Sequence, residues 1–167
     1  MSLNTTLGKR GYTIMKDELS SSEIIKIRKD LTVQAFVNQS YGTKSNPFPI
    51  YCESKRKLYI PRYYGINNFG IPKLNKLQDG ESIDIEFIHS LKPKQIPIVN
   101  KFIEVAKDIG GGIISIPCGY GKTVIALYII AKLGLKALVI VHKEFLVNQW
   151  KERIKQFLPN AKIGKIQ

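Results

Sequence analysis

The stretch that decides the fold is Ile113-Ile-Ser-Ile-Pro-Cys-Gly-Tyr-Gly-Lys-Thr123. Its first four residues, 113–116, are an isoleucine-rich run typical of a buried strand. Turn residues follow from Pro117 to Gly121, and Lys122 begins a segment whose apolar residues recur at helical spacing up to residue 133. A strand, a glycine-containing loop and a helix, with Gly-Lys-Thr at the junction, form the context that a phosphate-binding loop requires.

The residue types in this loop fit the binding of an anion. Gly119 and Gly121 allow backbone angles and close approaches that a Cβ atom would obstruct. The free amides of the loop and of the first helical turn would point at a phosphate. Lys122 would reach the β- and γ-phosphates, and the Thr123 hydroxyl would hold Mg²⁺. The general motif has a further glycine five residues before Gly121, where this chain has Ile116.

Length and composition limit the classes of protein to consider. The 167 residues are enough for one domain, or for one small domain and part of another, and 44% of them are hydrophobic. No segment is long and apolar enough to cross a membrane, and Met1 to Arg10 lack the apolar centre of a signal peptide. Cys52 and Cys118 are too few and too far apart for a metal site. We therefore expect an intracellular protein with reduced thiols that is not secreted.

The net charge of +13 is unevenly distributed along the sequence. Residues 1–90 carry 13 Lys and Arg against 9 Asp and Glu, and residues 91–167 carry 13 against 4. A basic region beside a nucleotide loop favours contact with a polyanion such as nucleic acid. Solubility, or an acidic partner segment elsewhere, would also account for the charge.

The first part of the chain, residues 1–82, is predicted to be a small α+β domain. We expect a flexible arm over residues 1–10 and an irregular connection over residues 67–80. Ser20 and Glu23 match a capping box, which starts a helix that ends near Asp30. Strands are expected at 11–15, at 31–37, and in a hairpin of 50–52 with 57–60. Pro61-Arg-Tyr-Tyr-Gly65 would either stack bases and hold phosphates or pack under a loop.

The second part, residues 83–167, is predicted to alternate strands with helices. Strands are expected at 83–87, 113–116, 137–141 and 162–166. Helices are expected from about 98 to 109, from 122 to 133 and from 143 to 158, and Trp150 would lie in the core. This order indicates an α/β fold with a parallel sheet and right-handed crossovers.

Three ordered blocks resemble the superfamily 2 helicases. Leu91-Lys-Pro-Lys-Gln95 is similar to the Leu-Arg-Pro-x-Gln element that precedes motif I in that family. Pro117 to Thr123 is similar to motif I, in which the first glycine is often replaced. The segment from Ala137 to Trp150 resembles motif Ia with its Gln-Trp helix. Motif I and the block from Tyr59 to Gly65 look closest to the excision-repair and transcription-factor branch, which includes members from large DNA viruses.

The resemblance implies a partial RecA-like lobe that uses ATP and Mg²⁺. Gln95 would recognise adenine, although it could instead bridge backbone groups. The implied ATP-binding residues of motif I are Pro117, Cys118, Gly119, Tyr120, Gly121, Lys122 and Thr123, with Lys122 and Thr123 catalytic, Thr123 on Mg²⁺ and no chemistry assigned to Tyr120. His142 and Lys143 would contact the nucleic-acid backbone, and the alternative for His142 is a surface histidine at a strand end.

No Asp-Glu pair follows Thr123, so motif II and the second lobe are not in this sequence. We therefore expect these 167 residues to be inactive alone and to be the N-terminal portion of an ATP-dependent helicase or translocase. DNA is the expected partner over RNA, in transcription or repair, and in a nucleus, viral factory or virion. The alternative is a non-enzymatic adaptor module that binds nucleic acid or protein.

Overall fold

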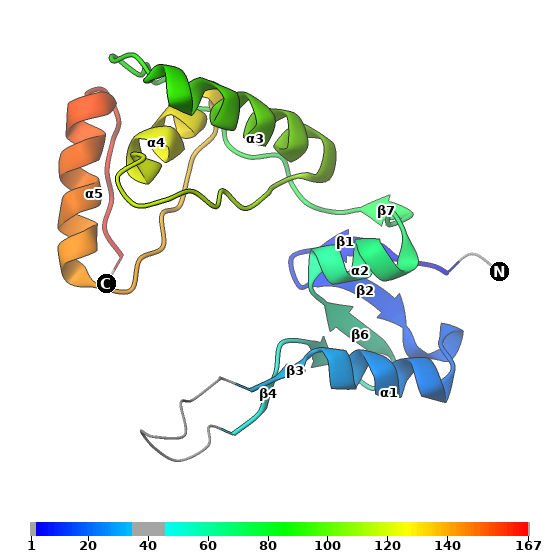
Figure 1. The fold of residues 1–167 in the computed structure, drawn as a ribbon. Coiled ribbons are helices and arrows are strands. Elements are labelled where there is room, and N and C mark those ends of the chain that lie inside the picture. Colours follow the sequence, from blue (N-terminus) through cyan, green and yellow to red (C-terminus); the bar gives the residue numbers. More distant parts are fainter. Residues whose placement is uncertain (1–2, 35–45, 167) are drawn as a thin grey trace. The chain divides into compact units, whose positions relative to one another are not determined.

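The computed structural model describes residues 3–34 and 46–166. The chain divides into two compact units, Met1–Asp79 and Gly80–Gln167 (Figure 1). Within the described ranges, no helix has the length and apolar character needed to cross a membrane. The predicted domain limits, 1–82 and 83–167, stay a prediction.

The first unit is built around a five-stranded sheet with the strand order β5-β6-β2-β1-β7. All neighbouring strands are antiparallel except β1 and β7, which are parallel. A separate pair is formed by β3 and β4. The elements are β1 (Thr6–Gly8), β2 (Gly11–Met15), the 3₁₀ turn η1 (Lys16–Glu18), α1 (Ser21–Asp30), β3 (Thr32–Val33), β4 (Phe48–Pro49), β5 (Cys52–Glu53), β6 (Lys57–Ile60), α2 (Arg62–Phe69) and β7 (Leu74–Asn75).

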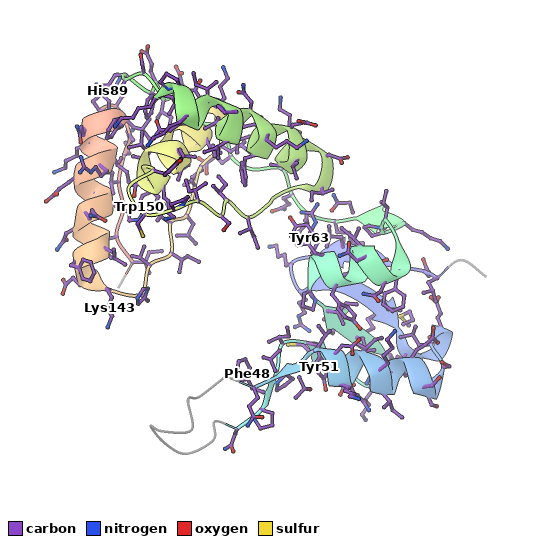
Figure 2. All side chains as sticks on the ribbon, viewed as in Figure 1. Phe48, Tyr51, Tyr63, His89, Lys143 and Trp150 are labelled. Carbon is purple, nitrogen blue, oxygen red and sulfur yellow. The ribbon has the colours of Figure 1, made fainter. Side chains whose placement is uncertain are left out.

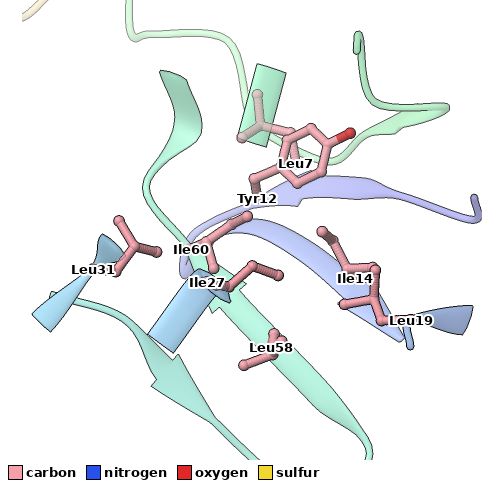
Figure 3. Packing of buried hydrophobic residues seen from close by; sticks show 8 residues of the cluster. All are labelled: Leu7, Tyr12, Ile14, Leu19, Ile27, Leu31, Leu58 and Ile60. Atoms are coloured by element: carbon pink, nitrogen blue, oxygen red, sulfur yellow. The ribbon is translucent and has the colours of Figure 1, made fainter. Parts of the chain in front are cut away.

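The core of the first unit lies on one face of this sheet. Alternate strand residues point to the same face, and here they pack against the apolar side of α1 and against α2. Gly65 of α2 sits against the Tyr12 ring, where any Cβ atom would overlap that ring. Figure 3 shows the eight buried side chains of this cluster: Leu7, Tyr12, Ile14, Leu19, Ile27, Leu31, Leu58 and Ile60.

Several predictions for the first unit are confirmed. The strand at 11–15 is β2, and the hairpin is formed by β5 and β6. The Ser20 hydroxyl accepts from the Glu23 amide, and the Glu23 carboxylate accepts from the Ser20 amide, so the capping box is present. The strand predicted at 31–37 is described only as β3, because residues 35–37 lie outside the described residues.

Two predictions for this unit are wrong. The expected flexible arm contains β1, an inner strand of the sheet, because Leu7 is buried in the core and provides a reason for the segment to pair. The expected irregular connection begins inside α2 and later contributes β7. The cluster at 61–65 therefore starts a helix. Its Tyr64 hydroxyl donates to the Asp30 carboxylate at 2.9 Å, while Tyr63 is exposed with the Arg62 guanidinium over its ring.

The second unit contains the three predicted helices. They are α3 (Ile96–Ile109), preceded by the 3₁₀ turn η3 (Pro93–Gln95), then α4 (Lys122–Leu133) and α5 (Glu144–Phe157). Helix α3 packs on α4 through Val99, Ile125 and Ile129. Phe87 packs against Tyr128 of α4 and Phe157 of α5, with ring centroids 5.2 and 5.4 Å apart.

The predicted parallel sheet of the second unit is not formed among the described residues, although the mixed α/β class is confirmed. The runs at 83–87, 113–116, 137–141 and 162–166 are not paired as strands, and Ser82, just before the first run, forms an isolated antiparallel bridge with Leu135. In a doubly wound sheet, strands that are consecutive in the chain are separated where the strand order reverses, so these runs need not all be neighbours.

Several apolar side chains on these runs are exposed as a consequence. Ile113 is 96% exposed and Ile140 is 85% exposed. Residues of the runs at 83–85, 136–141 and 160–166 line a cavity of about 880 Å³ together with α4 and α5. Trp150, predicted as a core residue, is half-buried on the wall of this cavity (Figure 2).

Candidate nucleotide-binding site

The loop from Pro117 to Gly121 leads into α4 with the backbone geometry that its glycines permit. Gly119 has a φ of 79° and Gly121 a φ of 80°, which is the left-handed region that favours glycine. Gly121 is also the residue that caps α4, and no side chain caps that helix. The amides of the first turn of α4 therefore form an end with partial positive charge and no side-chain acceptor.

The two residues predicted to hold phosphate and metal open α4. Lys122 is exposed, and its ammonium group donates to the carbonyl oxygen of Pro117 at 3.1 Å. This hydrogen bond spans the loop from its first residue to the start of the helix. Thr123 is the next residue in the same helical turn and is half-buried. The positive charge of Lys122 is thus held over the glycine loop.

Gln95 is buried, with 4% of its surface exposed, and its side-chain amide makes two hydrogen bonds that support the loop. Its Nε2 donates to the carbonyl of Tyr120 at 2.8 Å, and its Oε1 accepts from the backbone N–H of Lys92 at 2.9 Å. A Cβ atom on Gly121 would lie 2.6 Å from this Nε2. The absence of a side chain at Gly121 therefore allows the contact between Gln95 and the loop.

Lys94 makes a second contact with the same loop residue. Its ammonium nitrogen lies 4.1 Å from the centroid of the Tyr120 ring, which is within the range of a cation–π interaction. Tyr120 is thus held at its carbonyl by Gln95 and at its ring by Lys94. Sequence reasoning missed Lys94, because its partner lies 26 residues away and a lysine beside Gln95 has no distinctive spacing.

His142 and Lys143 lie on a different segment of the second unit. Both are exposed and follow the run 137–141. Figure 2 shows Lys143 where the chain enters α5. The carbonyl of Lys143 accepts from the backbone amides of Leu146 and Val147, so Lys143 is the residue that starts the helix. Both residues come directly before the first turn of α5, and the free amides of that turn favour a negatively charged group.

Other groups near the site are few. The Cys118 thiol is exposed and free. No group of three or more His, Cys, Asp or Glu residues in the described ranges could hold a metal ion by itself.

The two units carry similar net charges, with 13 basic against 6 acidic residues over 1–79 and 13 against 7 over 80–167. The uneven charge noted along the sequence therefore depends on assigning the acids at 81, 84 and 86 to the first part.

A glycine loop with left-handed residues, followed by a helix that opens with Lys-Thr, defines a P-loop type of α/β lobe. The comparison with known families agrees with this class. Residues 88–167 match the family described as type III restriction enzyme, res subunit. The second unit is therefore similar to this family over most of its length, which is consistent with the resemblance of its motifs to superfamily 2 helicases.

Named relatives come from viruses and an archaeon. The chain is 35% identical over 170 residues to a putative ATP-dependent RNA helicase, L396, of Acanthamoeba polyphaga mimivirus, covering 99% of this chain and 33% of the relative. It is 37% identical over 100 residues to putative helicase 161L of Invertebrate iridescent virus 6, covering 59% and 22%. It is 45% identical over 47 residues to the DNA 3'-5' translocase XPB2 of Sulfurisphaera tokodaii, covering 28% and 11%. The chain thus spans about a third or less of the length of these three relatives.

Proposed function

We propose that the second unit binds ATP through Pro117–Thr123, as part of an ATP-dependent nucleic-acid helicase or translocase. The observation that carries this proposal is the loop itself. Gly119 and Gly121 adopt left-handed angles, and α4 begins without a side-chain cap. These features leave backbone amides free to bind phosphate oxygens.

Each residue of the loop has a distinct role in this proposal. Lys122 would exchange the Pro117 carbonyl for the β- and γ-phosphates, since an ammonium group pairs more strongly with an anion than with a neutral carbonyl. Cys118 and Tyr120 would contribute their backbone amides. Thr123 would hold Mg²⁺ through its hydroxyl, and that ion, when bound, neutralises charge on the phosphate oxygens.

For Gln95 we propose a role in adenine recognition that is compatible with its contacts. A side-chain amide carries two hydrogens and an oxygen with two lone pairs, and one of each is engaged by Tyr120 and Lys92. The remaining hydrogen and lone pair match an adenine edge. If Gln95 reads the base, Gln95→Ala will weaken the binding of ATP more than that of GTP. If it only holds the loop, both affinities will fall equally.

His142 and Lys143 are proposed to contact the sugar-phosphate backbone of a nucleic acid. Their exposure and their place beside the end of α5 support this role. DNA is our preferred substrate. One relative is named an RNA helicase and another a DNA translocase, so the test uses both polymers. We further propose an intracellular role in the transcription or repair of a nuclear or viral genome.

The test is the ATPase rate of the 167-residue chain and of the longest natural form, each with and without single-stranded DNA or RNA. We expect the short chain to be inactive and the longer form to be stimulated by nucleic acid. Lys122→Ala should abolish activity in the longer form without changing its circular dichroism spectrum. An active Lys122→Ala variant would refute the role of Lys122. A longer form without ATPase activity would favour the adaptor function, which the separate core of the first unit also supports.

A further inference from the structure

The sheet of the first unit has two unlike faces. Both helices contact the face that carries Leu7, Tyr12 and Ile14. On the opposite face, strand pairing aligns one side chain from each strand in a single row: Cys52, Tyr59, Thr13, Thr6 and Leu74. Among the described residues of this unit, no helix packs against that row.

The helix-free face carries an aromatic ring with positively charged side chains near it. Tyr59 is half-buried on β6, between the core residues Leu58 and Ile60. The guanidinium of Arg10, from the turn between β1 and β2, lies over the Tyr59 ring at 5.3 Å from its centroid. Lys57 is exposed two residues before Tyr59, on the same face and about 7 Å along the strand.

No carboxylate belongs to this face among the described strand residues. Glu53 of β5 pairs with Leu58, so its side chain belongs to the helix side, where it forms ion pairs with Lys16 and Arg28. The remaining residues that alternate with the core on β1, β2 and β6 are Thr6, Gly8, Gly11, Thr13, Met15, Lys57 and Tyr59. Among the described strand residues, this face therefore carries basic and aromatic side chains and no acidic one.

We propose that this face is a second nucleic-acid contact, which binds single strands without nucleotide. Arg10 would move from the Tyr59 ring to a phosphate, a base would stack on the freed ring, and an adjacent phosphate would pair with Lys57. Aromatic rings on a basic sheet face are well suited to single strands, because every base has a flat π-surface and the backbone supplies the charge. The proposal is independent of the P-loop and of His142 and Lys143.

The test measures the fluorescence anisotropy of a labelled oligothymidylate of about 16 nucleotides, near the upper site size of one single-strand-binding module. The protein is the full 167-residue chain without ATP or Mg²⁺. Tyr59→Leu should weaken binding by about 5- to 150-fold, as expected for the loss of one stacking partner. Tyr59→Phe, which keeps the ring, should bind like the wild type.

Charge variants test the phosphate contacts. Arg10→Gln and Lys57→Gln should each weaken binding and lower the slope of log affinity against log salt by about 0.7. The matched control is Lys26→Gln, an exposed lysine on α1. Unchanged binding in Tyr59→Leu, or an equal loss in Lys26→Gln, would overturn the proposal.

Further arms separate this face from the proposed function. Lys143→Gln should leave the effect of Tyr59→Leu in place, since the two contacts are independent. A complete loss of binding in Lys143→Gln, with no effect of Tyr59→Leu, would place the whole interaction on the second unit and refute a contact on the first. Oligouridylate and duplex DNA complete the set, and tighter binding to duplex than to either single strand would also contradict stacking on Tyr59.

Discussion

Substituting alanine at the two loop glycines should have different effects, because only one of them touches Gln95. Both Gly119 and Gly121 have a φ near 80°, so alanine at either position adopts a left-handed angle. That cost is about 1–2 kcal/mol, partly offset by about 0.4–1 kcal/mol from a stiffer unfolded chain. Around Gly119 nothing lies within 4 Å of the added methyl group, so Gly119→Ala should destabilise by about 1 kcal/mol.

Gly121→Ala should cost more. Its methyl group would lie 2.6 Å from Nε2 of Gln95, which must then move away from the carbonyl of Tyr120. Losing that hydrogen bond adds about 1 kcal/mol, and leaving the partly buried carbonyl unpaired raises the total to about 2–3 kcal/mol. In a Gln95→Ala background this additional cost should disappear, which makes the pair suitable for a double-mutant cycle.

The assay is urea unfolding followed by the fluorescence of Trp150. This is the only tryptophan in the sequence, and it lies on α5, so its signal reports on the second unit. The additional 1–2 kcal/mol corresponds to a midpoint about 0.5–1 M lower for Gly121→Ala than for Gly119→Ala. Equal midpoints for the two variants, or an undiminished difference in the Gln95→Ala background, would refute the reasoning.

Two further predictions concern the first unit. Hydrogen bonds from Lys16 and Arg28 hold the pKa of Glu53 below its ordinary value of 4.5. The stability that this carboxylate contributes is therefore fully present above pH 4.5, and it is lost as the pH falls through the lower pKa of the folded state. Thermal unfolding followed by circular dichroism should therefore depend less on pH in this acid range for Glu53→Gln than for the wild type, and identical profiles would contradict the assignment. Gly65→Ala should destabilise the first unit by overlap with the Tyr12 ring while leaving the Trp150 unfolding curve unchanged; a shifted Trp150 curve would show that the units unfold together.

Local signals predicted α1, α3, α4 and α5, but not α2. The capping box at Ser20 and Glu23 sets the start of α1, and the apolar period of α3, α4 and α5 matches their bounds. These features are decided by residues within a few turns of one another. The glycine loop was also predictable from local sequence, because residues with left-handed backbone angles are usually glycines.

What the sequence could not predict depends on distant partners. Strand β1 was missed because Leu7 is the only apolar residue in its strand, and its burial comes from a cluster with residues distant in the chain, such as Tyr12, its partner in register. The contact of Lys94 with Tyr120 and the alignment of Arg10 over Tyr59 likewise join segments that are far apart in the chain. In the second unit, the isoleucine-rich runs have residues that favour strands, but a strand forms only when a neighbouring segment accepts and donates its backbone hydrogen bonds.

The most direct test of nucleotide binding at the glycine loop is a residue-resolved titration. Backbone amide shifts of ¹⁵N-labelled protein would be followed as Mg²⁺-ADP is added. We predict the largest shifts at Gly119, Gly121, Lys122 and Thr123, with affinity about 10- to 100-fold lower in Lys122→Ala, as expected when one charged hydrogen bond is lost. Saturating shifts confined to residues outside 117–123, or unchanged affinity in Lys122→Ala, would contradict the assignment of this loop as the phosphate site.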